Sequence, residues 1–168
     1  MDNQRLAASK DLLTFVLSFF PRVEAKASVV VGLDTAMLSL LGITAPPLKS
    51  LEWYMIFAVI PVGLILASLV FLYLQLFPQL DGGHESLIYF REIAKRTESK
   101  FIDEFLKQTE DAYVKDLLDQ VWRNSEILKK KFDHLKVSVI LLASAILPWL
   151  AALAMFAAKN TELKSLLK

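Results

Sequence analysis

The strongest constraint on this sequence is an apolar run with no charged residue, WYMIFAVIPVGLILASLVFLYLQLF, from Trp53 to Phe77. A helix needs roughly 20 mostly apolar residues to cross the hydrocarbon core of a bilayer, and this run exceeds that length. Composition agrees, because 55% of the 168 residues are hydrophobic and the mean hydropathy is +0.44. The run therefore predicts a membrane-spanning helix.

Two further stretches predict spans. Val137 to Ala158 is equally uncharged, whereas Ala25 to Pro46 is long enough only when its flanks are included and Asp34 is tolerated. The first residues include two acids and the apolar run that follows lacks a clean cleavage site, so we expect the N-terminus to be retained. The sequence thus predicts an all-α membrane protein with three transmembrane helices.

The distribution of basic residues predicts an orientation. The N-terminal segment carries four Lys or Arg and residues 78–136 carry eleven, whereas the loop between the first two spans has only Lys49. Basic segments stay on the cytoplasmic side, so the N-terminus and residues 78–136 are expected there. The predicted layout is an amphipathic helix (1–24), two spans with a short external loop (25–77), a cytoplasmic helical module (78–136), a third span (137–158) and an external tail (159–168).

Two alternatives stand for the N-terminal segment. Its apolar residues recur at helical spacing, and Pro21 suits the first turn of a following helix. The segment either lies in the membrane interface or packs against the cytoplasmic helices.

The cytoplasmic module is predicted to end in one long helix. Thr109 suits an N-cap, Glu110 and Asp111 favour a first turn, and no glycine or proline follows until Pro148. We therefore expect this helix to continue into the third span. Alternating spacings of four and three predict a coiled-coil-type seam at Val114, Leu118, Val121, Ser125, Leu128, Phe132 and Leu135.

The motifs of common enzymes and metal sites are absent from the sequence. There is no cysteine, no phosphate-binding glycine loop and no nucleophile elbow, and His84 and His134 are not at ligand spacing. We therefore predict no enzymatic activity and no metal site. The net charge of +1 gives no basic field for nucleic acid.

Asp34 is the unusual residue of the first span, since an unpaired charge near the bilayer midplane costs several kcal/mol. It is expected to be protonated, hydrogen-bonded to a neighbouring helix, or facing water in a pore; a re-entrant or tilted helix is a further alternative. Gly32 and Ala36 allow close helix approach on either side of it, which favours burial against another helix. Pro148 can kink the third span, as a gate or as ordinary packing.

Basic clusters mark the cytoplasmic module. Lys129, Lys130, Lys131 and Lys136 precede the third span, where anionic lipid headgroups are the expected partner. A second group combines guanidinium or ammonium groups with aromatic rings, the combination that binds phosphate and base. These candidates for nucleotide or anion binding are Tyr89, Arg91, Lys95, Arg96, Trp122 and Arg123.

The order of these features resembles the transmembrane effectors of Pycsar antiphage systems, small bacterial proteins that impair the inner membrane when a cyclic pyrimidine nucleotide is made during infection. Three stretches are similar to family motifs: VEAKASVVVGLDTAMLSLL, LIYFREIAK and DLLDQVWRNSEILKKKFDHLKVSVI. The family-like positions are Glu24, Lys26, Ala27, Tyr89, Phe90, Gln120, Lys130, Lys131 and Phe132.

The resemblance implies a pore-forming effector of the bacterial inner membrane that a nucleotide signal activates. It also implies a homo-oligomer, a signal-producing nucleotide cyclase or polymerase in the same system, and a cyclic nucleotide as ligand with no resident cofactor. No separate nucleotide-binding domain fits in the chain, so the sensor is the helical module itself or another protein. The alternative is a non-conducting membrane adaptor whose cytoplasmic coil recruits a partner.

Overall fold

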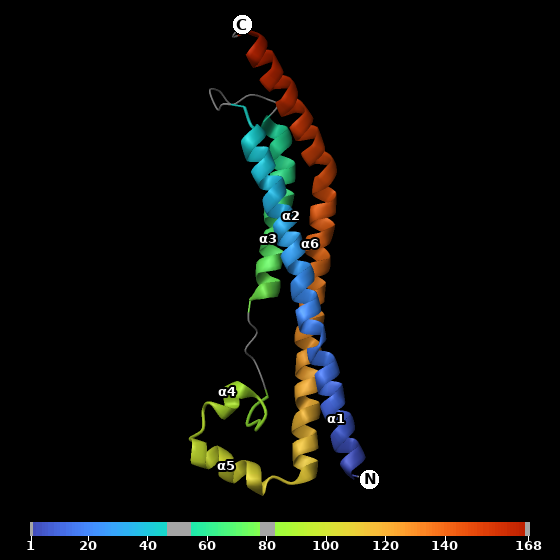
Figure 1. The fold of residues 1–168 in the computed structure, drawn as a ribbon, viewed down its shortest axis with the longest axis vertical. Coiled ribbons are helices and arrows are strands. Elements are labelled where there is room, and N and C mark those ends of the chain that lie inside the picture. Colours follow the sequence, from blue (N-terminus) through green and yellow to red (C-terminus); the bar gives the residue numbers. More distant parts are fainter. Residues whose placement is uncertain (1, 47–54, 78–82, 167–168) are drawn as a thin grey trace. The chain divides into compact units, whose positions relative to one another are not determined.

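The structure is a computed structural model that describes residues 2–46, 55–77 and 83–166, and the described residues form helices and no strand (Figure 1). The predicted loop with Lys49 and residues 78–82 lie outside this part. The helices are α1 (Asp2–Leu17), α2 (Phe19–Thr44), α3 (Ile56–Leu76), α4 (Phe90–Ile93), α5 (Glu98–Lys107) and α6 (Glu110–Leu166).

The all-α membrane fold is confirmed. Three helical stretches are long and apolar enough to cross a bilayer, namely Gln4–Thr44, Ile56–Leu76 and Glu110–Thr161. The last of them lies within α6, which begins at Glu110 and runs without a break through the predicted third span. The predicted continuation of the last helix of the module into that span is therefore confirmed as well.

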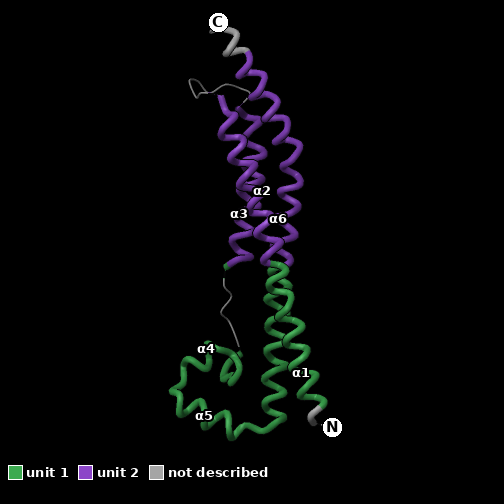
Figure 2. Tube along the Cα trace, viewed as in Figure 1, with its two compact units in different colours: residues 1–23, 77–131 green, residues 24–76, 132–168 purple. Residues whose placement is uncertain are grey.

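The chain divides into two compact units (Figure 2). Unit 1 contains residues 1–23 and 77–131, and unit 2 contains residues 24–76 and 132–168. Helix α6 contributes its first part to unit 1 and its remainder to unit 2.

Unit 2 is a three-helix arrangement in which each helix buries one seam. On α3 the buried residues recur at spacings of four and three, which keeps one stripe turned toward the partner helices. The seam residues are Ala27, Val30, Asp34 and Leu41 on α2, Pro61, Ile65, Ser68, Leu72 and Gln75 on α3, and Leu135, Ser138, Leu142, Ala145, Ala152 and Phe156 on α6.

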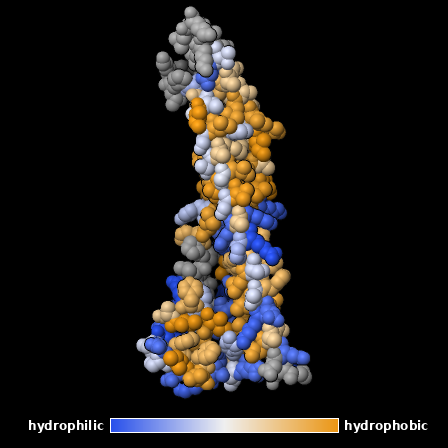
Figure 3. All heavy atoms as spheres, in the orientation of Figure 1, coloured by the Kyte–Doolittle hydropathy of each residue, from blue (hydrophilic) through white to orange (hydrophobic). Residues whose placement is uncertain are grey.

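The outer surface of unit 2 is also apolar, as the face seen in Figure 3 shows. Large side chains there are strongly exposed, including Ile43 at 81% and Leu147 at 77%. Helices that are apolar on all sides suit a hydrocarbon environment, because lipid and not water then covers the outer face.

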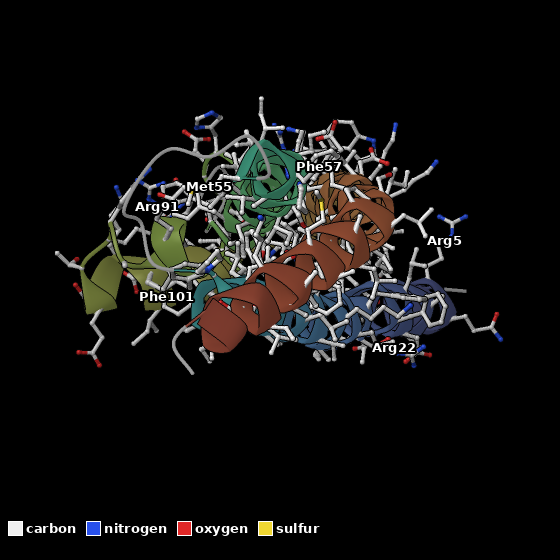
Figure 4. The ribbon with its side chains drawn as sticks, turned by 90° about the horizontal axis from the view of Figure 1, so that it is seen from above. Arg5, Arg22, Met55, Phe57, Arg91 and Phe101 are labelled. Carbon is white, nitrogen blue, oxygen red and sulfur yellow. The ribbon has the colours of Figure 1, made fainter. Side chains whose placement is uncertain are left out.

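Unit 1 is built on α1, α4, α5 and the first part of α6. Helix α1 ends where Ser18 N–H donates to the Thr14 oxygen at 3.0 Å, and α2 starts at once with Pro21 in its first turn. Arg5 and Arg22 extend away from the ribbon of these helices (Figure 4). The Lys10 ammonium lies 5.6 Å from the Tyr113 ring centroid on α6, a contact that favours packing of α1 against the other helices of the unit.

The predicted seam on α6 is confirmed at Leu135, which is 6% exposed, and is wrong at Leu118. Leu118 is 45% exposed, and the helix instead buries Leu117, Gln120 and Lys131. The prediction placed only apolar residues and one serine at inward positions. The register differs because Gln120, a polar residue, takes an inward position and donates a hydrogen bond there.

Candidate functional site

One polar layer crosses the apolar seam of unit 2, and we call it the Asp34 layer. It consists of Asp34 on α2, Ser68 on α3 and Ser138 on α6, each with 0% of its surface exposed. Ser68 Oγ lies 2.7 Å from Asp34 Oδ2 and 3.2 Å from the backbone oxygen of Ser138. The burial of Asp34 against another helix is confirmed, and that helix is α3 of the same chain.

The Asp34 layer is not fully satisfied. Asp34 Oδ1 is buried and has no hydrogen-bond partner among the described residues. A buried polar atom without a partner costs about 1–3 kcal/mol, because it has lost its hydrogen bonds to water. The layer is therefore a weak point in the packed seam.

Gly32 and Ala36 lie away from this layer. Both are exposed, and a Cβ added at Gly32 would meet no atom within 4 Å. They therefore do not help to bury Asp34 within the chain. Pro148 is half-buried inside α6, which stays one helix through that position.

Two polar side chains tie α6 to α2 within unit 2. Trp149 Nε1–H donates to the Met37 oxygen at 3.0 Å, and Asn160 Nδ2–H donates to the Thr44 oxygen at 3.0 Å. The second bond satisfies a carbonyl at the C-terminal end of α2, where helical partners are missing. Both bonds fix the position of α6 along α2.

In unit 1, Arg96 holds the turn before α4 and the helix α5 together. Its guanidinium donates to Glu104 Oε2 at 2.7 Å and to the backbone oxygens of Glu92 at 2.7 Å, Glu85 at 2.8 Å and Ser86 at 3.3 Å. Glu85 has a φ of 62°, a left-handed conformation that these contacts help to maintain. We call Arg96 with its four partners the Arg96 cluster.

Helix α6 holds the same turn from the other side. Asp116 Oδ2 accepts from Leu87 N–H at 2.8 Å, and one helical turn later Gln120 Nε2–H donates to Ser86 Oγ at 3.3 Å. Ser86 Oγ also accepts from Tyr89 N–H at 3.0 Å. These contacts make Gln120, a family-like position, a structural residue that joins the turn to α6.

The anion-binding candidates are only partly brought together. Lys95 and Arg96 line a hollow of about 490 Å³, together with Lys100, Leu87 and the acids Glu85, Glu92 and Glu104. Its three cations therefore face three carboxylates. Tyr89 precedes α4, and Arg91 lies on α4 (Figure 4).

Trp122 and Arg123 are not part of this hollow. Trp122 is 58% exposed, and the Arg123 guanidinium lies 5.3 Å from its ring centroid while also facing Glu126 at 3.8 Å. The two residues form a cation–π pair on α6.

Acidification is expected to weaken the contact between Lys95 and Glu92, two residues that line the hollow. The hydrogen bond from Lys95 is the main cause that lowers the pKa of Glu92 from its ordinary value of 4.5. A lowered pKa in the folded state means that the contribution of Glu92 to stability is present above pH 4.5 and is lost as the pH falls through the lowered value. The protection factors of the amides of residues 85–95, obtained from hydrogen exchange after correction for its intrinsic pH dependence, should fall over that pH range in the native protein and stay constant in Glu92→Gln; equal profiles would contradict this.

The other family-like positions are mostly at the surface. Glu24, Lys26 and Lys130 are exposed, Phe90 is 64% exposed, and Phe132 is half-buried. Ala27 and Lys131 are the exceptions, with 0% and 7% exposure.

Several residues of these sites were not predicted from the sequence. Ser68 and Ser138 look like ordinary small residues of a span, and Asp116 looks like a solvated acid of a helix. A usable signal existed, since serine at seam spacing in an apolar helix marks a buried hydroxyl that needs a partner. The partner itself is visible only in three dimensions.

Comparison with known families adds a finding that covers most of the chain. Residues 8–158 match the family model described as the Pycsar effector protein domain. No curated protein and no solved structure gave a match. The match includes most of each spanning stretch and both sites described above, and the three apolar helices agree with a location in the membrane. The chain therefore belongs to the Pycsar effector family and is a membrane effector of antiphage defence.

Proposed function

We propose that this chain disrupts the bacterial inner membrane when a nucleotide signal reaches its helical module at the cytoplasmic face. The observation that supports the proposal best is the Asp34 layer, three polar groups from three helices at one level of an apolar bundle. A structural anchor has no need of such a layer, because apolar residues would pack the seam at lower cost.

The layer gives the bundle a way to open. With the helices packed, Asp34 is enclosed and one of its oxygens lacks a partner. If the helices part or rearrange around water, Asp34 and Ser68 gain hydrogen bonds that the closed bundle does not provide. This gain offsets part of the packing energy that is lost, so the difference in free energy between the closed and open states is small enough for a signal to reverse.

Assembly of several copies is part of the proposal. The face of α2 that points away from its seam carries small residues at spacings of three and four, all of them exposed: Ala25, Ser28, Gly32, Thr35, Ser39 and Gly42. Small residues let helices approach closely in a bilayer, where no hydrophobic effect drives association. A second copy packed along this face would leave the Asp34 layer free to open.

The signal is proposed to act through α6. Asp116 and Gln120 bind the turn of unit 1, and the same helix carries Ser138 of the Asp34 layer. A phosphate that competes with Glu92 or Glu104 for Lys95, Arg96 or Lys100 would loosen the turn held by α6. The nucleotide is supplied by a cyclase or polymerase of the same defence system.

A membrane adaptor is the second candidate, and the apolar surface of unit 1 favours it. Phe90 on α4 is 64% exposed, and Leu106 on α5 is 77% exposed. Such side chains can receive a partner protein without any change in the membrane.

The test is dye influx in cells that express the chain with and without the signal-producing enzyme. We expect influx only with the enzyme, and at least about a tenfold reduction for Asp34→Leu, because leucine removes the polar layer and about 1.4 kcal/mol suffices for that factor. Ser144→Ala is the matched control, since Ser144 is an exposed serine of α6 that belongs neither to the Asp34 layer nor to the small-residue face of α2. Intact membranes in every case at confirmed expression would exclude the effector role and leave the adaptor.

A further inference from the structure

The Asp34 layer contains one hydroxyl between two acceptors. Ser68 Oγ is 2.7 Å from a carboxyl oxygen of Asp34 and 3.2 Å from the backbone oxygen of Ser138. A serine hydroxyl carries a single proton, so it donates to only one of these oxygens at a time. If Asp34 were a carboxylate, the Ser68 hydroxyl would donate its proton to one of the two oxygens. Its contact with the other oxygen would then bring two hydrogen-bond acceptors together with no proton between them, in a site without water.

From this geometry we infer that the closed bundle holds a proton on Asp34, which donates to Ser68, and that Ser68 in turn donates to the backbone oxygen of Ser138. Every short contact of the layer then has one donor and one acceptor, and the layer is neutral. The one covalent change is the O–H bond that forms when the Asp34 carboxylate takes up a proton from bulk water as the bundle closes, and opening returns that proton to water. The ligand of the site is thus a proton.

The charged groups nearby do not replace that proton. On α3 the single ionisable residue in Ile56–Leu76 is Tyr73, which is 63% exposed. On α6 His134 lies one turn before Ser138, with its ring 6.1 Å from Phe71. On α2 Lys26 is two turns away and exposed. Among the described residues no ion pair involving Asp34 is formed, so the carboxyl has no cation to balance a negative charge.

A proton held in the closed state couples opening to pH. When water reaches the layer, Asp34 returns to the behaviour of a solvated aspartate, which is ionised above about pH 4. Opening then releases one proton per chain, so the open state is favoured about tenfold for each unit by which the pH rises. The sign follows from linkage, because the closed state binds more protons. This consequence rests on the proposed function, whereas the protonation of Asp34 does not.

Infrared difference spectroscopy of the full chain in lipid vesicles tests the protonation directly. At neutral pH we expect a protonated-carboxyl carbonyl band that shifts in heavy water and is missing from Asp34→Asn. Asparagine keeps a donor toward Ser68 and cannot titrate, so its fold is retained, as circular dichroism will verify. Ser144→Ala, at an exposed serine of α6, should keep the band. A native spectrum identical to that of Asp34→Asn in this region would overturn the inference.

Dye release from the same vesicles, with the signal-producing enzyme and its nucleoside triphosphate substrates present, tests the coupling. Between about pH 6 and about pH 8 release by the native chain should rise by at least tenfold, whereas Asp34→Asn should change by less than about twofold. Equal pH profiles for the two would also overturn the coupling. The two failures are distinguishable: a carboxyl band without any dye release refutes the proposed function alone, and dye release without the band refutes the proton alone.

Discussion

Replacing Ile65 by alanine is expected to destabilise the membrane bundle by about 2 kcal/mol. Ile65 has 0% of its surface exposed and belongs to the seam that faces α2 and α6. Lipid is as apolar as isoleucine, so the loss comes from the cavity left behind and its missing van der Waals contacts and not from transfer to water.

The neighbouring residue provides the matched control. Leu66 loses a similar number of methyl and methylene groups in Leu66→Ala, but it is 51% exposed on the outer face. We expect a change below about 0.5 kcal/mol there. Both are measured by reversible denaturant titration of helix content in mixed micelles. Equal losses for the two variants would show that α3 is not oriented as described.

Removal of the Arg96 side chain is expected to release the turn of residues 85–89 and α5 from each other. In Arg96→Ala three backbone oxygens and one carboxylate lose their donor, at a cost of about 2 kcal/mol. Glu104 is 37% exposed, so water takes over part of its solvation and the cost stays below that of a buried ion pair. Hydrogen exchange of residues 85–107 in the full chain should accelerate by about tenfold or more.

Lys100 is the matched control for this change. It approaches the same carboxylate, Glu104, at 3.8 Å, but its side chain is 65% exposed. Lys100→Ala should therefore leave the exchange of residues 85–107 nearly unchanged, and Arg96→Lys should fall between the two because lysine lacks the planar fork. If Lys100→Ala accelerated exchange as much as Arg96→Ala, the positive charge near Glu104 and not the hydrogen bonds of the Arg96 cluster would hold residues 85–107 together.

Much of the fold could be predicted because lipid imposes a simple requirement. A backbone in hydrocarbon must satisfy its own hydrogen bonds, so each long uncharged run implies a helix, and the absence of glycine and proline between Thr109 and Pro148 implies a continuous one. The structure has both features, including α6 from Glu110 to Leu166. The family follows from the same linear order of motifs and does not depend on contacts.

The register of α6 in unit 1 could not be predicted in the same way. Apolar spacing placed Leu118 inside, yet the inward residue is Gln120, whose amide meets Ser86 across a separation of 34 residues. A prediction from hydrophobic periodicity places apolar side chains inside and polar side chains outside. It therefore assigns a polar side chain that is buried against a distant partner to the wrong face.

The sequence by itself determined that this chain has three apolar helices, that a carboxyl lies within one of them, and that it belongs to a family of membrane effectors. Tertiary structure alone decided where that carboxyl points and what satisfies it. Asp34 meets Ser68 and the backbone of Ser138 because three seams come together at one level, and the sequence separations of 34 and 70 residues carry no local signal of this meeting. A hydrogen bond depends on the distance between two atoms, and folding sets that distance.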